Sequence, residues 1–139
     1  MPKITAGLIT LIFFLGLLST PVSAASSGNL IAEINQFRAS KGLFPIRSNS
    51  STCSFAATRA SEIAGNFSHT GFYNRISGKT LPYPHYRLVT ENLAWAPGDL
   101  NPVRMWINSP SHAVNMLKNT PFVCVVNQGD YFAYEGLAI

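Results

Sequence analysis

The pattern of hydrophobic residues differs between three parts of the chain. Residues 4–18 form an almost unbroken apolar run behind Lys3. From 29 to 117, apolar residues recur three or four positions apart in several segments, as in helices that bury one face. From 122 to 139, β-branched and aromatic residues dominate, which favours strands. This order, helices first and strands last, predicts an α+β domain behind an apolar leader.

Two helices are predicted directly after the leader. The first begins at Asn29, a favourable N-cap, and ends at Gly42. The second covers roughly residues 53–65 and follows a cluster of Ser, Thr and Asn. Their apolar faces are Leu30, Ile31, Ile34 and Phe37 in the first helix and Phe55, Ala56, Ala60, Ile63 and Ala64 in the second.

The middle of the chain carries strong turn and helix-start signals. Residues 70–90 contain several Gly and Pro and are expected to be irregular, with a short helix starting near Thr90. Asn101-Pro102 and Ser109-Pro110 each place a capping residue before a proline, which predicts two further helices. The two apolar runs 122–126 and 131–139 then predict a hairpin with a four-residue loop, 127–130.

Residues 1–24 have the features of a signal peptide. Lys3 precedes the apolar run, and Val22-Ser23-Ala24 places small residues where a signal peptidase cleaves. The alternative is an uncleaved membrane anchor, although the run is shorter than the roughly 20 residues of a spanning helix. We therefore expect a secreted protein whose residues 25–139 form one domain, with membrane contact only through an uncleaved signal.

The charge distribution gives little indication of a partner. The chain has ten Lys and Arg against six Asp and Glu, and the basic residues are scattered rather than clustered. A scattered basic set does not favour nucleic acid. A loose attraction to anionic envelope polymers and ordinary solubility are both consistent with it. We expect a monomer.

Two cysteines, Cys53 and Cys124, are present in the part expected outside the cell. An even number in an exported chain favours a disulfide, which would stabilise a loop of this size by roughly 4 kcal/mol. Two buried thiols are the alternative. A catalytic cysteine is less consistent with Cys124, which lies in an apolar strand-like run.

Three polar residues, His69, Glu91 and His112, stand in unusual surroundings. Taken singly, each has a plain structural interpretation: a histidine after a helix is often a hydrogen-bonding group, and Glu91 could begin a helix. Together, two imidazoles and a carboxylate could bind zinc, or the carboxylate could orient one histidine as a general base.

Five segments in order along residues 28–139 resemble the CAP superfamily, which comprises the cysteine-rich secretory, antigen 5 and pathogenesis-related proteins, and within it the short bacterial branch. The segments are Ile34-Asn35-Gln36-Phe37-Arg38 with Gly42-Leu43-Phe44-Pro45, then Phe67-Ser68-His69, Glu91-Asn92-Leu93-Ala94, Trp106 to Leu117 with His112, and Tyr131-Phe132-Ala133-Tyr134. The resemblance implies a three-layer α-β-α sandwich. It also implies a cleft in which His69, Glu91 and His112 match the family positions.

The sequence departs from the family pattern at two positions. Ser109 stands where many eukaryotic relatives have a second Glu, and Thr90 replaces a Gly that often precedes the first Glu. The first departure removes a carboxylate from the cleft. The function we expect is an extracellular binding module for an envelope or extracellular ligand, with a zinc site at His69 and His112. The alternatives are a hydrolase acting on peptides or envelope polymers through His69, Glu91 and His112, a lipid or sterol binder, and a purely structural hydrogen-bond network.

Overall fold

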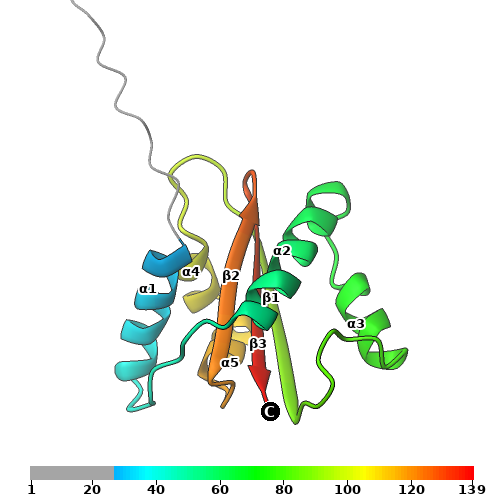
Figure 1. Ribbon diagram of the computed structural model, residues 1–139. Helices are drawn as coiled ribbons and strands as arrows, with labels where there is room; N and C mark the ends of the chain where they lie inside the picture. The colour runs from blue at the N-terminus through cyan, green and yellow to red at the C-terminus, as the bar shows by residue number, and fades with distance from the viewer. Residues whose placement is uncertain (1–26) are drawn as a thin grey trace, which may run out of the picture.

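The computed structural model describes residues 27–139 as a small sheet with helices on both faces (Figure 1). The predicted signal peptide lies outside the described residues. The elements are α1 Ser27–Ala39, α2 Ser50–Gly65, α3 Thr70–Ser77, β1 Leu88–Trp95, α4 Pro102–Ile107, α5 Pro110–Leu117, β2 Phe122–Gln128 and β3 Tyr131–Ala138. No helix among the described residues is long and apolar enough to span a membrane.

The sheet is antiparallel and has the order β1-β3-β2, so that β3 is central and β1 is an edge strand. In this register Glu91 on β1 faces Glu135 on β3. The hairpin connects β2 to β3, whereas β1 joins β3 from a distant part of the sequence. As an edge strand, β1 pairs with one strand only, and α4 and α5 pack against it.

Helices cover both faces of the sheet in three layers. Helix α2 packs on β2 and β3 on one face, while α1, α4 and α5 cover the other (Figure 1). Trp106 and Tyr134 are central to the core beneath α1, α4 and α5, and Phe55 and Leu137 to the core beneath α2. The α+β class and the α-β-α sandwich are confirmed.

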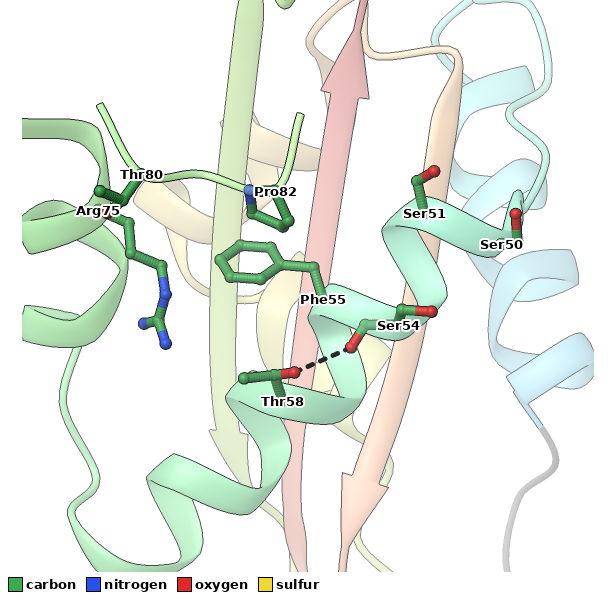
Figure 2. A pocket seen from close by; sticks show the side chains of 8 residues that line it. All are labelled: Ser50, Ser51, Ser54, Phe55, Thr58, Arg75, Thr80 and Pro82. Atoms are coloured by element: carbon green, nitrogen blue, oxygen red, sulfur yellow. Dashed lines mark hydrogen bonds between the residues drawn. The ribbon is translucent and has the colours of Figure 1, made fainter. Parts of the chain in front are cut away.

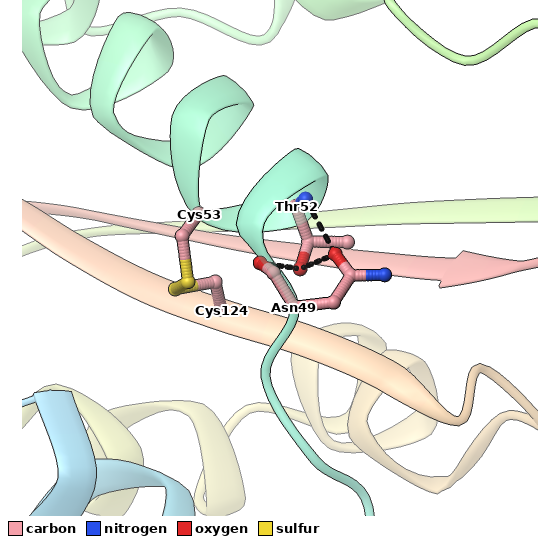
Figure 3. The surroundings of a disulfide bond; sticks show 4 residues. All are labelled: Asn49, Thr52, Cys53 and Cys124. Carbon is pink, nitrogen blue, oxygen red and sulfur yellow. Dashed lines mark hydrogen bonds between the residues drawn. A yellow bond between two sulfur atoms is a disulfide. The ribbon is translucent and has the colours of Figure 1, made fainter.

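The disulfide is confirmed between Cys53 and Cys124, and it joins α2 to β2 (Figure 3). Close to it, the side chain of Asn49 caps α2 by accepting a hydrogen bond from the backbone N–H of Thr52 at 2.8 Å. The bond and the cap together fix the start of the helix that later supplies Arg59 to the site.

The ends of the first two helices differ from the prediction. Helix α1 begins at Ser27, so Asn29 is inside the helix, and it ends at Ala39. Gly42 lies in the following turn at a φ of 72°, a left-handed conformation that favours glycine. Helix α2 begins at Ser50, earlier than predicted, because Asn49 provides the cap.

Two predictions for the middle of the chain are wrong. Residues 70–77 form α3 instead of an irregular segment, and Leu88–Trp95 is a strand where a short helix was expected near Thr90. Strand β1 is buried on both faces, so it lacks the apolar–polar alternation of a half-exposed strand. Its buried polar residues Glu91 and Asn92 are bonded by groups from other elements. The residues of the strand itself do not indicate these partners.

The predictions for the last part are confirmed except for the hairpin loop. Helices α4 and α5 begin at Pro102 and Pro110, as expected. Strand β2 continues to Gln128, so the turn comprises only Gly129 and Asp130. Gly129 has a φ of 57°, which suits the first central position of a tight hairpin turn.

Candidate functional site

Glu91 is the centre of a buried polar cluster on the edge strand β1. Its Oε2 accepts a hydrogen bond from Arg59 Nε at 2.6 Å, and its Oε1 pairs with His69 Nδ1 at 2.7 Å. Burial opposes ionisation of Glu91, but the hydrogen bonds from His69 and Arg59 outweigh it and lower the pKa of the carboxyl group. Glu91 is therefore a carboxylate at neutral pH.

His69 lies at the N-terminal end of α3, with its side chain 38% exposed. The pairing of Nδ1 with Glu91 favours the tautomer in which Nδ1 carries the proton and Nε2 has a free lone pair. Within residues 27–139, no protein group forms a hydrogen bond with Nε2 of this ring. His69 thus combines a buried anchor with an accessible second nitrogen.

Arg59 of α2 holds the two sides of this cluster together. Its guanidinium is buried; it bonds Glu91, donates to the carbonyl oxygen of Ser68 at 2.8 Å, and forms an ion pair with Glu62. The carbonyl of Ser68 directly precedes His69, so Arg59 also fixes the entry to α3. A Cβ at Gly71 would collide with the same guanidinium, which accounts for glycine at this position.

His112 approaches β1 from α5. Its Nδ1 is 2.8 Å from the hydroxyl of Ser109. Ser109 occupies the N-cap position of α5, yet its hydroxyl makes no capping bond. Ser109 thus has the predicted N-cap position, but its hydroxyl is bonded to the His112 ring and does not cap the helix.

Hydrogen bonds from asparagine side chains to backbone carbonyl groups hold α5 against β1. Asn92 Nδ2 donates to the carbonyl oxygen of His112 at 2.9 Å, and Asn115 Nδ2 donates to that of Glu91 at 3.1 Å. Burial lowers the pKa of His112, and the proximity of the His69 ring acts in the same direction. His112 is accordingly a neutral imidazole at neutral pH.

The structure thus places His69 and Glu91 in direct contact and His112 beside the same strand. No hydrogen bond joins the His112 side chain to His69 or Glu91 in the described part of the chain. The described residues also contain no group of three or more His, Cys, Asp or Glu side chains arranged to hold one metal ion.

Glu135 is a member of the cluster that the sequence did not indicate. It is 1% exposed, faces Glu91 across the sheet, and its Oε1 has no hydrogen-bond partner among the described residues. Burial raises the pKa of Glu135 well above its ordinary value, and the negative charge of Glu91 raises it further. Only the register between β1 and β3 could have revealed this pair.

A hollow of about 420 Å³ lies elsewhere, beside the first half of α2 (Figure 2). Two of its polar side chains are bonded within the protein: Thr58 Oγ1 donates to the carbonyl oxygen of Ser54 at 3.1 Å, and Arg75 is bonded to Glu62 and to the carbonyl oxygen of Gly71. None of His69, Glu91 and His112 lines it. The lining residues are Ser50, Ser51, Ser54, Phe55, Thr58, Arg75, Thr80 and Pro82.

Solved structures with the same arrangement of helices and strands were found by comparison. A cysteine-rich secretory protein from Staphylococcus aureus aligns at a TM-score of 0.62 and 21% identity, over 84% of this chain and 40% of its own. An extracellular protein containing an SCP domain, from Bacillus anthracis, aligns at 0.67 and 20% identity, over 81% and 40%. The chain has a CAP-type fold.

An outer surface protein from Borrelia burgdorferi shares this CAP-type fold at a TM-score of 0.64 and 24% identity, over 78% of this chain and 88% of its own. The chain spans only 40% of the length of the first two proteins. No family model matches the chain. No curated protein matches it in sequence. The resemblance drawn from five short segments is thus confirmed at the level of fold.

Proposed function

We propose that this protein is an exported binding module in which His69 and His112 bind a divalent metal ion such as zinc. The observation that carries the proposal is the 2.7 Å pairing of His69 Nδ1 with Glu91. Metal-binding histidines generally donate their second ring N–H to a carboxylate or another acceptor, which fixes the tautomer and makes the free nitrogen a better ligand. In this arrangement Glu91 orients His69 and is not itself a ligand.

The second histidine has an equivalent support. His112 Nδ1 is paired with the hydroxyl of Ser109, and its lowered pKa keeps the ring neutral, as metal binding requires. Ser109 stands where many eukaryotic CAP proteins have a glutamate. The hydroxyl would thus orient His112 without adding a negative charge.

Two protein ligands are fewer than the three that tight catalytic zinc sites use. We therefore expect weak binding, with the remaining coordination positions left for water or for a donor group of an extracellular ligand. Such a site suits recognition of an envelope component that carries its own oxygen or nitrogen donors. The apolar leader at 4–18 supports export of the protein.

Zinc titration by calorimetry tests this proposal on the wild type, His69→Ala, His112→Ala and His85→Ala. His85 is an exposed histidine outside the cluster and is the matched control. We expect binding to be lost in the first two variants and unchanged in the control. Equal binding by the wild type and His112→Ala would refute the site.

A hydrolase is the second candidate, because the Glu91–His69 pair also has the geometry of an acid that orients a general base. No hydroxyl or thiol of residues 27–139 is bonded to His69 Nε2, so the nucleophile would be water. Turnover of peptides or envelope fragments should then disappear in Glu91→Gln. The lipid or sterol alternative stays a prediction from the family resemblance.

A further inference from the structure

The segment 41–47, which links α1 to α2, has a backbone held firmly by α1. Arg38 Nε donates to the carbonyl oxygen of Phe44 at 2.9 Å, and the backbone N–H of Leu43 donates to the carbonyl oxygen of Arg38 at 3.0 Å. Asn35 bonds both backbone groups of Ile46, at 2.8 and 3.0 Å. A link with this many fixed backbone groups has a defined shape.

Arg38 also ties this segment to the end of α5. Its guanidinium is buried, and Nη1 donates to the carbonyl oxygens of Met116 at 2.8 Å and Lys118 at 3.0 Å. The backbone N–H of Arg47 donates to the carbonyl oxygen of Pro121 at 3.0 Å, just before β2. Residues 41–47 and Lys118 therefore belong to one end of the sandwich, the end where β2 begins (Figure 1).

On this fixed backbone, two large apolar side chains are held in water. Phe44 is 88% exposed, the highest value among the exposed large hydrophobic residues, and Leu43 is 38% exposed. Single exposed apolar residues are common on protein surfaces. An almost fully exposed phenylalanine on a rigid link, next to a second exposed apolar residue, is less common.

The charged residues around Phe44 are all positive. Lys41, Arg47 and Lys118 are all exposed, and the Arg47 guanidinium lies over the Phe122 ring at 5.0 Å, which holds it at this end. All six acidic residues of the chain are among residues 27–139, and they are located elsewhere. They are Glu33 beside Asn101, Glu62 beside Arg59 and Arg75, the buried Glu91 and Glu135, Asp99 ahead of α4, and Asp130 in the turn at the far end of the hairpin.

We propose that this end of the protein docks on an anionic lipid bilayer. The Phe44 loop, defined as Lys41, Leu43, Phe44, Arg47 and Lys118, would place its two apolar side chains among the upper acyl carbons. Its three cations would remain at the level of the lipid phosphates, where basic residues near an anionic surface are favoured. The interaction is shallow, reversible and sensitive to salt.

A bilayer fits the loop better than a soluble polyanion does. Three cations alone would serve either partner, but only a bilayer offers apolar volume for the Phe44 ring. Docking would also leave the candidate site open. The loop follows α1, which packs on β2, whereas Glu91 is on β1 at the opposite edge of the sheet.

Co-sedimentation with vesicles of phosphatidylglycerol or of phosphatidylcholine, at low and high salt, tests the proposal. The wild type should bind the anionic vesicles, release them at high salt, and leave the neutral ones unbound. Phe44→Ser should weaken binding roughly tenfold, the effect of keeping one aromatic side chain out of an apolar phase. Lys41→Glu should weaken it at low salt and have little effect at high salt.

Phe67→Ser is the matched control, because Phe67 is 52% exposed and lies outside the loop, next to Tyr131 at the other end of β3. It should bind vesicles as the wild type does. Equal binding by Phe44→Ser and the wild type overturns the proposal, as does an equal loss in Phe67→Ser. Binding to dextran sulfate as strong as to vesicles, with Phe44→Ser unaffected, would assign the loop to a polyanion and not to a bilayer.

Discussion

Glu91 and Glu135 lie directly opposite each other on β1 and β3, and both side chains are buried. Two carboxylates on directly opposite residues repel each other strongly in a medium that excludes water. Arg59 is the buried cation bonded to Glu91, and it compensates one negative charge. Of the two, Glu91 is therefore the stronger acid, and Glu135 holds its proton to a higher pH.

The proton on Glu135 makes the stability of the fold dependent on pH. The ordinary carboxyl pKa is 4.5, and that of Glu135 is well above it in the folded protein. Above pH 4.5 the folded state keeps a proton that the unfolded state loses, so this residue makes the free energy of unfolding fall as pH rises. Other charges that act on it are Glu91, Arg59 and Arg75.

We expect Glu135→Gln, which cannot ionise, to remove this fall. Urea unfolding at a series of pH values above 4.5 should show the variant gaining stability relative to the wild type as pH increases. Glu62→Gln, at a half-exposed carboxylate whose pKa is lowered, should not show such a gain. Parallel curves for Glu135→Gln and the wild type would contradict the raised pKa of Glu135.

Removing Arg59 should destabilise the protein severely. Arg59→Met leaves the buried Glu91 without its cation, and breaking one partner of a buried ion pair costs about 3–5 kcal/mol. Arg104→Met is the control, because Arg104 is an exposed basic residue of α4, and its loss should change stability by less than about 0.5 kcal/mol. Denaturant unfolding at neutral pH measures both, and similar small changes would show that Arg59 does not compensate Glu91.

The hydroxyl of Ser109 should affect metal binding by His112 more than it affects the stability of the fold. Ser109→Ala removes the group paired with Nδ1, and loss of such a supporting partner typically weakens metal binding by about 10-fold to 100-fold. Stability should change by less than about 1 kcal/mol, because this hydroxyl makes no capping bond. Zinc titration and NMR of the His112 ring give the two readouts, with the exposed Ser111→Ala as control. Unchanged ring signals and zinc affinity in Ser109→Ala would rule out this orienting role.

Reduction of the disulfide between Cys53 and Cys124 should lower the free energy of unfolding by roughly 4 kcal/mol, because it releases a long loop in the unfolded chain. The chain has two cysteines, so a reductant acts on this bond alone. The variant with both cysteines changed to alanine should behave as the reduced protein does, and should not respond to reductant. Equal unfolding curves in oxidised and reduced buffer would mean that the cross-link contributes no stability.

Local patterns in the sequence were sufficient for α1, α2, α4, α5 and the hairpin. Each of these elements has an apolar periodicity or a cap with a proline, and these signals act within a few residues. The cysteine pair was also predictable, because compartment and number restrict what two cysteines do. His69, Glu91 and His112 were identified as candidates, although nothing in their spacing showed which of them touch.

Strand β1 and its polar contacts were decided by tertiary structure. Glu91 and Asn92 are tolerated inside the fold because Arg59 and Asn115, far away in sequence, bond them. The sequence by itself determined the fold class, the cross-link and the identity of the candidate residues, since these depend on local periodicity and residue type. Only the three-dimensional register placed Glu135 opposite Glu91 and Arg59 beside it, because the cost of a buried charge depends on its neighbours in space.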